Sequence, residues 1–192
     1  SNFMGSCVSI GELIVMASDL VIEGYKPDCT IRFMVTTGHE WGQIGQGENI
    51  GIQKYLDNLS DSELGKIKSV LVMDGNAPID FTLNLETQIS SEILVKKVNE
   101  YVDIYLGLHS DNRFTHLINP FDNSETARVT EGHVWSSKNI PVVLVSEDSK
   151  SKYIEIEDTS EDNNTQITDN VMVDYVVEFY KGVLKIMCDE KY

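Results

Sequence analysis

The sequence predicts an α/β protein built as a three-layer αβα sandwich, with helices on both faces of a mixed, mostly parallel sheet. Two observations support this. Apolar segments of strand length alternate along the chain with longer segments of helical pattern. The strand segments "TIRFMV" and "IPVVLV" are predominantly apolar, which is typical of strands covered on both faces. With 192 residues, 41% of them hydrophobic, the chain has the size and composition of one domain spanning residues 1–192.

The first half of the chain predicts two helical and two strand segments. Residues 6–22 are apolar on most sides, as in a helix packed on a sheet, and Gly24 and Pro27 follow as terminators. Residues 30–37 predict a buried strand. Residues 49–67 have a helical pattern with a break at "LSDSE", and "SVLVMD" predicts the next buried strand.

The second half continues the alternation, with strands at residues 81–87 and 140–147 and helices at residues 90–107 and 168–187. We expect the strands near residues 30–37, 69–73 and 141–145 to lie in the interior of the sheet, because they are continuously apolar. Two acidic stretches of low hydrophobicity interrupt the pattern and predict long loops. They cover residues 109–133 and 157–169.

Charge and cysteine content exclude several classes of function. The formal net charge of −16 argues against nucleic acid and anionic membrane surfaces as partners, because both attract basic proteins. No apolar run approaches the ~20 residues of a membrane span. Cys7, Cys29 and Cys188 are widely spaced and form no CxxC pair, so we expect neither a thiolate metal site nor a disulfide framework. The apolar surroundings of Cys7 and Cys29 predict core residues.

Candidate site residues follow the predicted strands. Ligand sites in such sheets form at the carboxyl ends of the strands, where "TTGHEWG", "MDGNAP" and "SEDSK" are predicted to lie. The first segment contributes His39 and Glu40, and the second contributes Asp74. We therefore expect these three residues near one another at one edge of the sheet. His109 and His116 fall in a predicted loop and have no ligand partner at helical spacing.

Four segments, in this order, carry a resemblance to a known family: "TTGHEWGQIGQGENIGIQKYL", "LSDSELGKIKSVLVMDG", "TEGHVWSSKNIPVVLV" and "DTSEDNNTQITDNVMVDYVVEF". Their order and spacing, from about residue 2 to residue 185, resemble the M28 zinc exopeptidases, the aminopeptidases related to glutaminyl cyclases. The resemblance implies a zinc exopeptidase-like fold. It also implies that the chain lacks the strands that open the family's domain, together with their His-x-Asp motif.

In that family two zinc ions, bridged by an aspartate and a water, activate the water for peptide hydrolysis. By resemblance, Glu40 and Asp74 match one ligand of each zinc. His39 falls where the general-base glutamate of the family stands, Asn2 where the bridging aspartate stands, and Asp158 where the last histidine ligand stands. Two of the five expected protein ligands therefore remain, whereas stable zinc sites use about three or four. The resemblance implies an incomplete zinc site, or none.

The main interpretation is an M28 metallopeptidase-like domain without dizinc hydrolysis, which binds a peptide or protein partner or serves as a structural part of a larger protein. The alternative is an active zinc-dependent aminopeptidase, completed by a segment or chain not present here. His39, Glu40, Asp74 and Asp158 could also form a new site for Mg²⁺, Ca²⁺ or Mn²⁺. A third hypothesis is an unrelated α/β binding protein.

For His133 and Trp135 we expect a role in helix packing, and the alternative is that they line a pocket. The sequence names no compartment.

Overall fold

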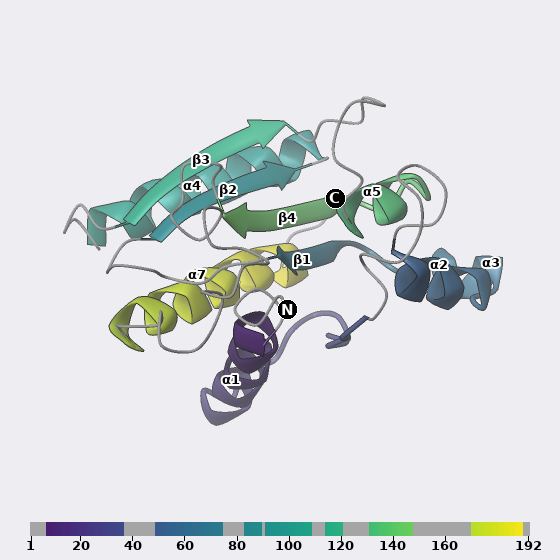
Figure 1. Ribbon diagram of the computed structural model, residues 1–192, viewed down its shortest axis with the longest axis horizontal. Coiled ribbons are helices and arrows are strands. Elements are labelled where there is room, and N and C mark those ends of the chain that lie inside the picture. The colour runs from purple at the N-terminus through teal and green to yellow at the C-terminus, as the bar shows by residue number, and fades with distance from the viewer. Residues whose placement is uncertain are drawn as a thin grey trace, which may run out of the picture.

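The structure is a computed structural model that describes residues 7–36, 49–74, 83–89, 91–108, 114–120, 131–147 and 170–189. Helices and strands are interspersed along it, in agreement with the α/β class (Figure 1). In chain order the elements are α1 (Ser9–Ile22), α2 (Ile50–Asp57), α3 (Asp61–Leu64), β1 (Val70–Asp74), β2 (Leu83–Ile89), α4 (Glu92–Leu108), β3 (Phe114–Pro120), α5 (Glu131–Ser136), β4 (Val142–Glu147) and α7 (Asn170–Asp189).

The sheet has the strand order β1-β4-β2-β3. β1 pairs parallel with β4, β2 pairs parallel with β3, and β2 joins the two pairs by running antiparallel to β4. The prediction of a mixed, mostly parallel sheet is therefore confirmed. β4 lies in the interior as expected, but β1 stands at the end of the strand order among the described strands. The prediction that the strand near residues 69–73 is interior is wrong for this sheet.

A second correction concerns the strand predicted at residues 30–37. Residues 30–36 form neither helix nor strand, and residue 37 lies outside the described ranges. Phe33 and Val35 are 37% and 55% exposed, whereas Ile31 and Met34 pack against two different hydrophobic clusters. The apolar run that suggested a buried strand thus has two buried contacts and two exposed side chains.

The prediction of a loop over residues 109–133 is also wrong in part. It contains β3 and the beginning of α5, and His116 lies in β3, in register with Leu85 of β2. Polar residues in "FTHLINP" concealed the strand from a search for apolar runs. His109 and residues 157–169 lie outside the described residues.

The predicted break between α2 and α3 is confirmed. α2 ends at Asp57, and α3 begins after Ser60. The Ser60 backbone N–H and hydroxyl both donate to the Glu63 carboxylate, at 2.8 and 2.6 Å. This exchange between the residue before the helix and the third helical residue is a capping arrangement. It holds the pKa of Glu63 below its ordinary value, because both hydrogen bonds favour the charged carboxylate.

Successive residues of β4 are buried against opposite faces of the sheet. Val143 and Val145 join the larger hydrophobic cluster, which includes side chains of α1, α4 and α7. Val142 and Leu144 join the smaller cluster, which includes Val72 of β1 and side chains of α2 and α5. All four side chains are at most 1% exposed. Helices therefore pack against both faces of β4, as its continuous apolar sequence predicted.

Aromatic side chains fill the interface between α4 and α7. The ring centroids of Tyr101, Tyr105 and Phe179 lie 5.5–5.9 Å apart, within the range of favourable aromatic pairs. The Tyr105 hydroxyl donates to the Tyr175 carbonyl oxygen at 2.6 Å, which satisfies its polar end. Burial raises the pKa of Tyr105 well above its ordinary value. The contact between α4 and α7 is thus made by aromatic side chains that carry no charge at neutral pH.

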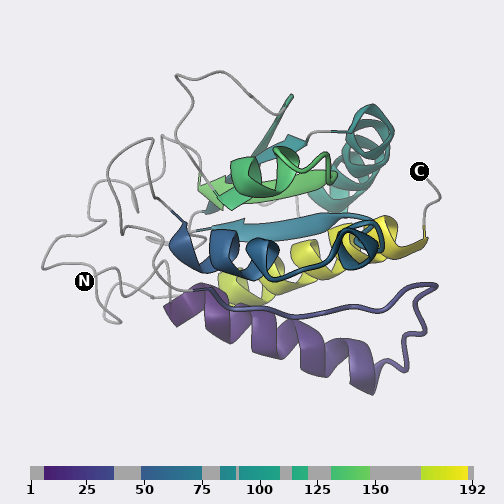
Figure 2. The same cartoon turned by 90° about the vertical axis from the view of Figure 1, so that its right-hand side faces the viewer.

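The predicted helix at residues 6–22 is confirmed as α1, but its packing differs from the prediction. α1 packs against α7, and in both views α7 lies on the sheet side of it (Figures 1 and 2). Met16 and Leu20 are its buried contacts, whereas Val21 and Ile22 are exposed. Gly24 ends the helix with a φ of 67°, a conformation that favours glycine. Among the described residues, no helix combines the length and apolar character needed to cross a membrane.

We predict that Leu94→Ala in α4 lowers the free energy of unfolding by about 2–5 kcal/mol, because Leu94 is fully buried and its removal leaves a cavity. Ile93→Ala, one position away on the same helix, is the matched control. Ile93 is 51% exposed, so its loss should cost under about 1 kcal/mol. Urea denaturation followed by circular dichroism measures both, and equal effects would contradict this packing of α4.

We predict that Gly182→Ala destabilises the protein although alanine is the better helix former. A Cβ at residue 182 would overlap the ring and hydroxyl of Tyr101. Overpacking typically costs about 1–3 kcal/mol, which outweighs the ~1 kcal/mol gained in helix propensity. Gly107→Ala is the control, since a Cβ there meets nothing within 4 Å. Thermal unfolding should show a lower midpoint for the first variant and an equal or higher one for the second.

Candidate functional site

The strands β1 and β4 bring their carboxyl ends to one edge of the sheet, because they run parallel. Asp74, the last residue of β1, is in register with Ser146 of β4. β2 runs the opposite way, so its first half lies at the same edge, with Glu86 in register with Ser146 from the other side. Three polar positions therefore form one row across the sheet, in the order Asp74, Ser146, Glu86.

The spacing of this row limits what it can bind. Neighbouring strands lie about 4.8 Å apart, so the backbones at Asp74 and Glu86 are separated by roughly 10 Å, with Ser146 between them. Glu86 was missed in the sequence analysis, because nothing in "FTLNLET" showed that this strand runs antiparallel to β4.

Asp74 is the predicted site residue that the structure places, and it stands at the carboxyl end of its strand as expected. His39, Glu40, Asp158 and Asn2 lie outside the described residues. The expected proximity of His39 and Glu40 to Asp74 therefore stays a prediction. Within the described ranges, no three histidine, cysteine, aspartate or glutamate residues lie close enough together to hold a metal ion. The described residues alone do not fit a zinc centre.

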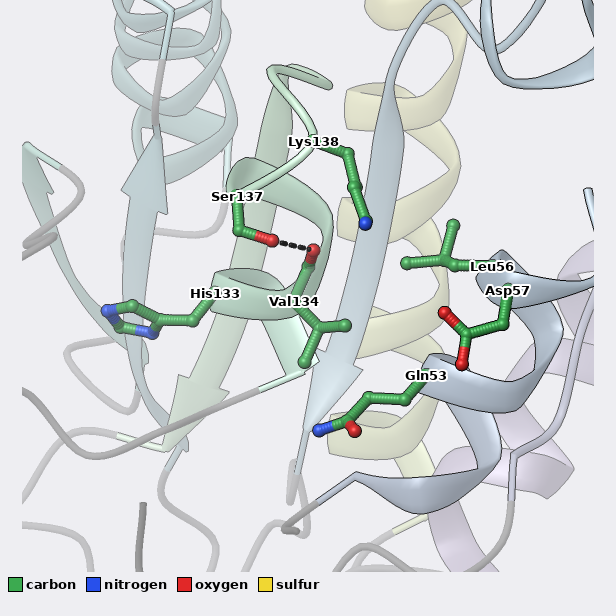
Figure 3. A pocket seen from close by; sticks show the side chains of 7 residues that line it. All are labelled: Gln53, Leu56, Asp57, His133, Val134, Ser137 and Lys138. Atoms are coloured by element: carbon green, nitrogen blue, oxygen red, sulfur yellow. Dashed lines mark hydrogen bonds between the residues drawn. The ribbon is translucent and has the colours of Figure 1, made fainter. Parts of the chain in front are cut away.

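A hollow of about 360 Å³ lies between α2 and α5, on the far side of β1 and β4 from α7. Figure 3 shows Asp57 of α2 and Lys138, which follows α5, on opposite sides of the hollow, with the Gln53 amide of α2 below them. His133 points away from these three side chains. The residues that line the hollow are Gln53, Leu56, Asp57, His133, Val134, Ser137 and Lys138.

The hollow is lined by polar and charged groups. It offers a carboxylate, an amide and an ammonium group, and all three belong to exposed residues. The Ser137 hydroxyl donates to the Val134 carbonyl oxygen at 2.7 Å, instead of to a base that could activate it. A polar ligand could exchange hydrogen bonds with these groups.

The helices on either side of this hollow, α2 and α5, pack against the sheet through the smaller hydrophobic cluster. Trp135 is 4% exposed and packs against the ring of Tyr55, with centroids 6.0 Å apart. The helix-packing role predicted for Trp135 is confirmed. His133, two residues earlier on α5, lines the hollow, so the two residues that the sequence grouped together have different surroundings. The Tyr55 hydroxyl also accepts a hydrogen bond from Arg32, in the segment that follows α1.

The fold is similar to that of bacterial zinc aminopeptidases. An aminopeptidase from Aneurinibacillus sp. strain AM-1 matches 97% of this chain with a TM-score of 0.66 at 14% sequence identity. A zinc aminopeptidase from Bacillus subtilis matches 94% of it with a TM-score of 0.67, also at 14% identity. The chain spans about 40% of the length of each. Identity this low shows a common fold alone. A scan against protein-family models gives no match, and neither does a search of curated proteins.

We predict that Trp135→Ala lowers the free energy of unfolding by about 3–5 kcal/mol, because it empties the core beneath the hollow. Lys138→Ala, at the rim of the same hollow, should stay within about 0.5 kcal/mol of the natural chain. Chemical denaturation of both variants measures the difference. A mild effect of Trp135→Ala would show that α5 does not pack on the sheet in this way.

Proposed function

We propose that the chain is an M28-type peptidase-like domain with the three-layer αβα sandwich of the zinc exopeptidases, which acts as a binding or structural domain without dizinc hydrolysis. The likeness to bacterial zinc aminopeptidases over 94–97% of this chain supports the family relationship. The packing of helices against both faces of β4 supports the layered arrangement.

The observation that carries this proposal is the setting of Asp74, the predicted zinc ligand that the structure describes. Its register neighbour across the sheet is Ser146, and the next position is Glu86, so neither position in register with it is a histidine. In the sequence, Asn2 stands at the bridging position and Asp158 at the position of the last histidine. A neutral amide at Asn2 cannot offer two anionic oxygens to two cations. Both changes weaken the same dizinc centre.

Loss of the metals would remove most of the catalytic power of such a site. Paired zinc ions lower the pKa of a bound water and polarise the substrate carbonyl. His39, at the general-base position, could accept a proton near neutral pH. General-base catalysis without a metal-activated water supplies only about 10²–10⁴-fold. A chain that has His39 but no bound metal ions should therefore bind peptides without cleaving them at a useful rate.

The expected partner is a peptide or a protein. Two features of the described residues could serve it: the row of Asp74, Ser146 and Glu86 at the sheet edge, and the hollow between α2 and α5. Acidic groups belong to both, in a chain of formal net charge −16. Such a charge balance favours partners that carry lysine or arginine over acidic ones.

The second candidate function is an active zinc aminopeptidase that is completed by residues outside this chain. The observation in its favour is that the chain spans only about 40% of the length of the two aminopeptidases. A supplied bridging carboxylate and histidine could restore the metal ligands that Asn2 and Asp158 do not provide. The two functions differ in metal content, since the active form would hold about two zinc ions per chain.

We predict that the chain alone does not hydrolyse aminoacyl anilides or peptides above the background rate with added zinc, cobalt or manganese. The physical reason is the loss of anionic bridging and imidazole ligation at the positions of Asn2 and Asp158. A chromogenic aminoacyl anilide assay measures turnover, and elemental analysis of the dialysed protein measures zinc.

The control for this assay is Glu40→Ala, which removes one of the two ligands that match the family. The natural chain and the variant should be equally inactive and equally free of zinc. Metal-dependent turnover that disappears in Glu40→Ala, together with about two zincs per chain in the natural protein, would overturn the proposal and establish the aminopeptidase.

A further inference from the structure

The last turns of α7 lie against the segment that follows α1, residues 23–29. The Tyr25 hydroxyl donates to the Asp189 carboxylate at 2.7 Å, and the Lys185 ammonium lies 5.3 Å from the centre of the Tyr25 ring. Lys185 and Lys181 both donate to the Glu23 carboxylate, at 2.6 and 2.5 Å. These contacts fix the C-terminal end of α7 and this segment side by side, although they stand far apart in the sequence.

Two cysteine thiols meet inside this contact. Cys188, in the last turn of α7, is buried, and Cys29, in the segment after α1, is half-buried. The electrostatic interactions of the Cys188 thiol include the Cys29 thiol and the Tyr25 hydroxyl, so these groups lie near one another. Cys7, by contrast, is exposed, so its predicted core position is wrong. The wide sequence spacing of the cysteines gave no indication of the Cys29–Cys188 pair.

We propose that Cys29 and Cys188 form a reversible disulfide that ties the end of α7 to the segment after α1. Asp189 directly follows Cys188, and its hydrogen bond with Tyr25 holds the segment that carries Cys29 against this end of α7. A disulfide needs its two Cα atoms to be about 4.4–6.8 Å apart. The surrounding pairs of Tyr25 with Asp189 and of Glu23 with the two lysines hold both backbones in place without the bond. We therefore expect the disulfide to form with these contacts in place.

The order of the two chemical steps follows from the environment of each thiol. Burial and hydrogen bonding to Cys29 raise the pKa of Cys188 to about 12, so at neutral pH it is a protonated thiol and a poor nucleophile. Cys29 is more accessible, and it attacks first. Its thiolate displaces one thiol from a small-molecule disulfide such as oxidised glutathione and forms a mixed disulfide.

The Cys188 sulfur then loses its proton to water and attacks the Cys29 sulfur, which expels the second small thiol. Two protein thiols are oxidised and one external disulfide is reduced. Removal of the Cys29 thiol in the first step also removes the neighbour that helps to keep Cys188 protonated. Closure of the protein disulfide should therefore be favoured once the mixed disulfide exists.

The bond would close a loop that includes every described strand of the sheet. Cross-links over loops of this length restrict the unfolded chain strongly. They also hold α1 and α7 together at their shared end. The oxidation state of this pair would therefore set the stability of the contact between α1 and the rest of the molecule, independently of any peptide binding or hydrolysis.

The test is a disulfide map of the folded protein after treatment with graded ratios of oxidised to reduced glutathione. Cys7 and Cys29 fall in one tryptic peptide, residues 1–32, because Lys26 precedes Pro27 and resists cleavage. A Cys7→Ser variant removes this ambiguity. Mass spectrometry should then show residues 1–32 linked to residues 186–191. Digestion after Glu12 and Glu23 gives the same readout on the natural chain.

The matched control is the Cys7→Ser/Cys29→Ser double variant, which should show no linked peptide at any ratio. The oxidised Cys7→Ser protein should unfold at a midpoint about 5–15 °C above its reduced form, whereas the midpoint of the double variant should not change. Three results would overturn the proposal: mixed disulfides alone, a cross-link that forms only in denaturant, or an unchanged midpoint in the cross-linked protein.

Discussion

The burial of β4 on both faces is the constraint on which the rest of the structure depends. Four consecutive apolar residues, 142–145, alternate between the two hydrophobic clusters, so every residue in the centre of this strand contacts a core. β4 also carries the hydrogen bonds that join the parallel pair β1–β4 to the pair β2–β3. Helices must cover both faces of such a strand, because any exposed face would leave valine and leucine side chains in water. The positions of α7 and α4 on one face and of α5 and α2 on the other follow from this need.

This arrangement separates what stabilises the fold from what could form a site. Apart from the polar ends of a few tyrosines, the two clusters consist of apolar side chains, and Asp74, Ser146 and Glu86 lie in register just beyond the apolar part of β4. Substitution of polar residues at the carboxyl edge of a sheet leaves such a core intact, because ligand sites there sit outside the packed layers. A chain of this kind can therefore keep an aminopeptidase-like fold while its metal ligands change, which is how we interpret Asn2, His39 and Asp158.

The sequence indicated this fold wherever one physical signal was strong. The long periodic helices α1, α4 and α7 and the apolar strands β1 and β4 were all predicted, since each buries a continuous face. β3 was missed because Thr115, His116 and Asn119 interrupt its apolar residues, so no continuous apolar run marks the strand. The segment of residues 30–36 was misjudged because its apolar run predicted a buried strand, whereas it forms no strand and leaves Phe33 and Val35 exposed. For the site, the sequence placed Asp74 correctly at a strand end, but the neighbours Ser146 and Glu86 depend on strand direction and register. The contact of Cys29 with Cys188 depends likewise on how α7 returns to α1, which no local pattern encodes.

The central claim is that an aminopeptidase-like fold persists here without the dizinc centre. Its most direct test is anomalous diffraction at the zinc absorption edge from crystals of this chain grown with zinc. Our account predicts the αβα layers around β4 with no anomalous peak beside the end of β1 at Asp74. Two neighbouring peaks there, close enough to share a bridging ligand, with Glu40 and Asp74 among their ligands, would contradict it.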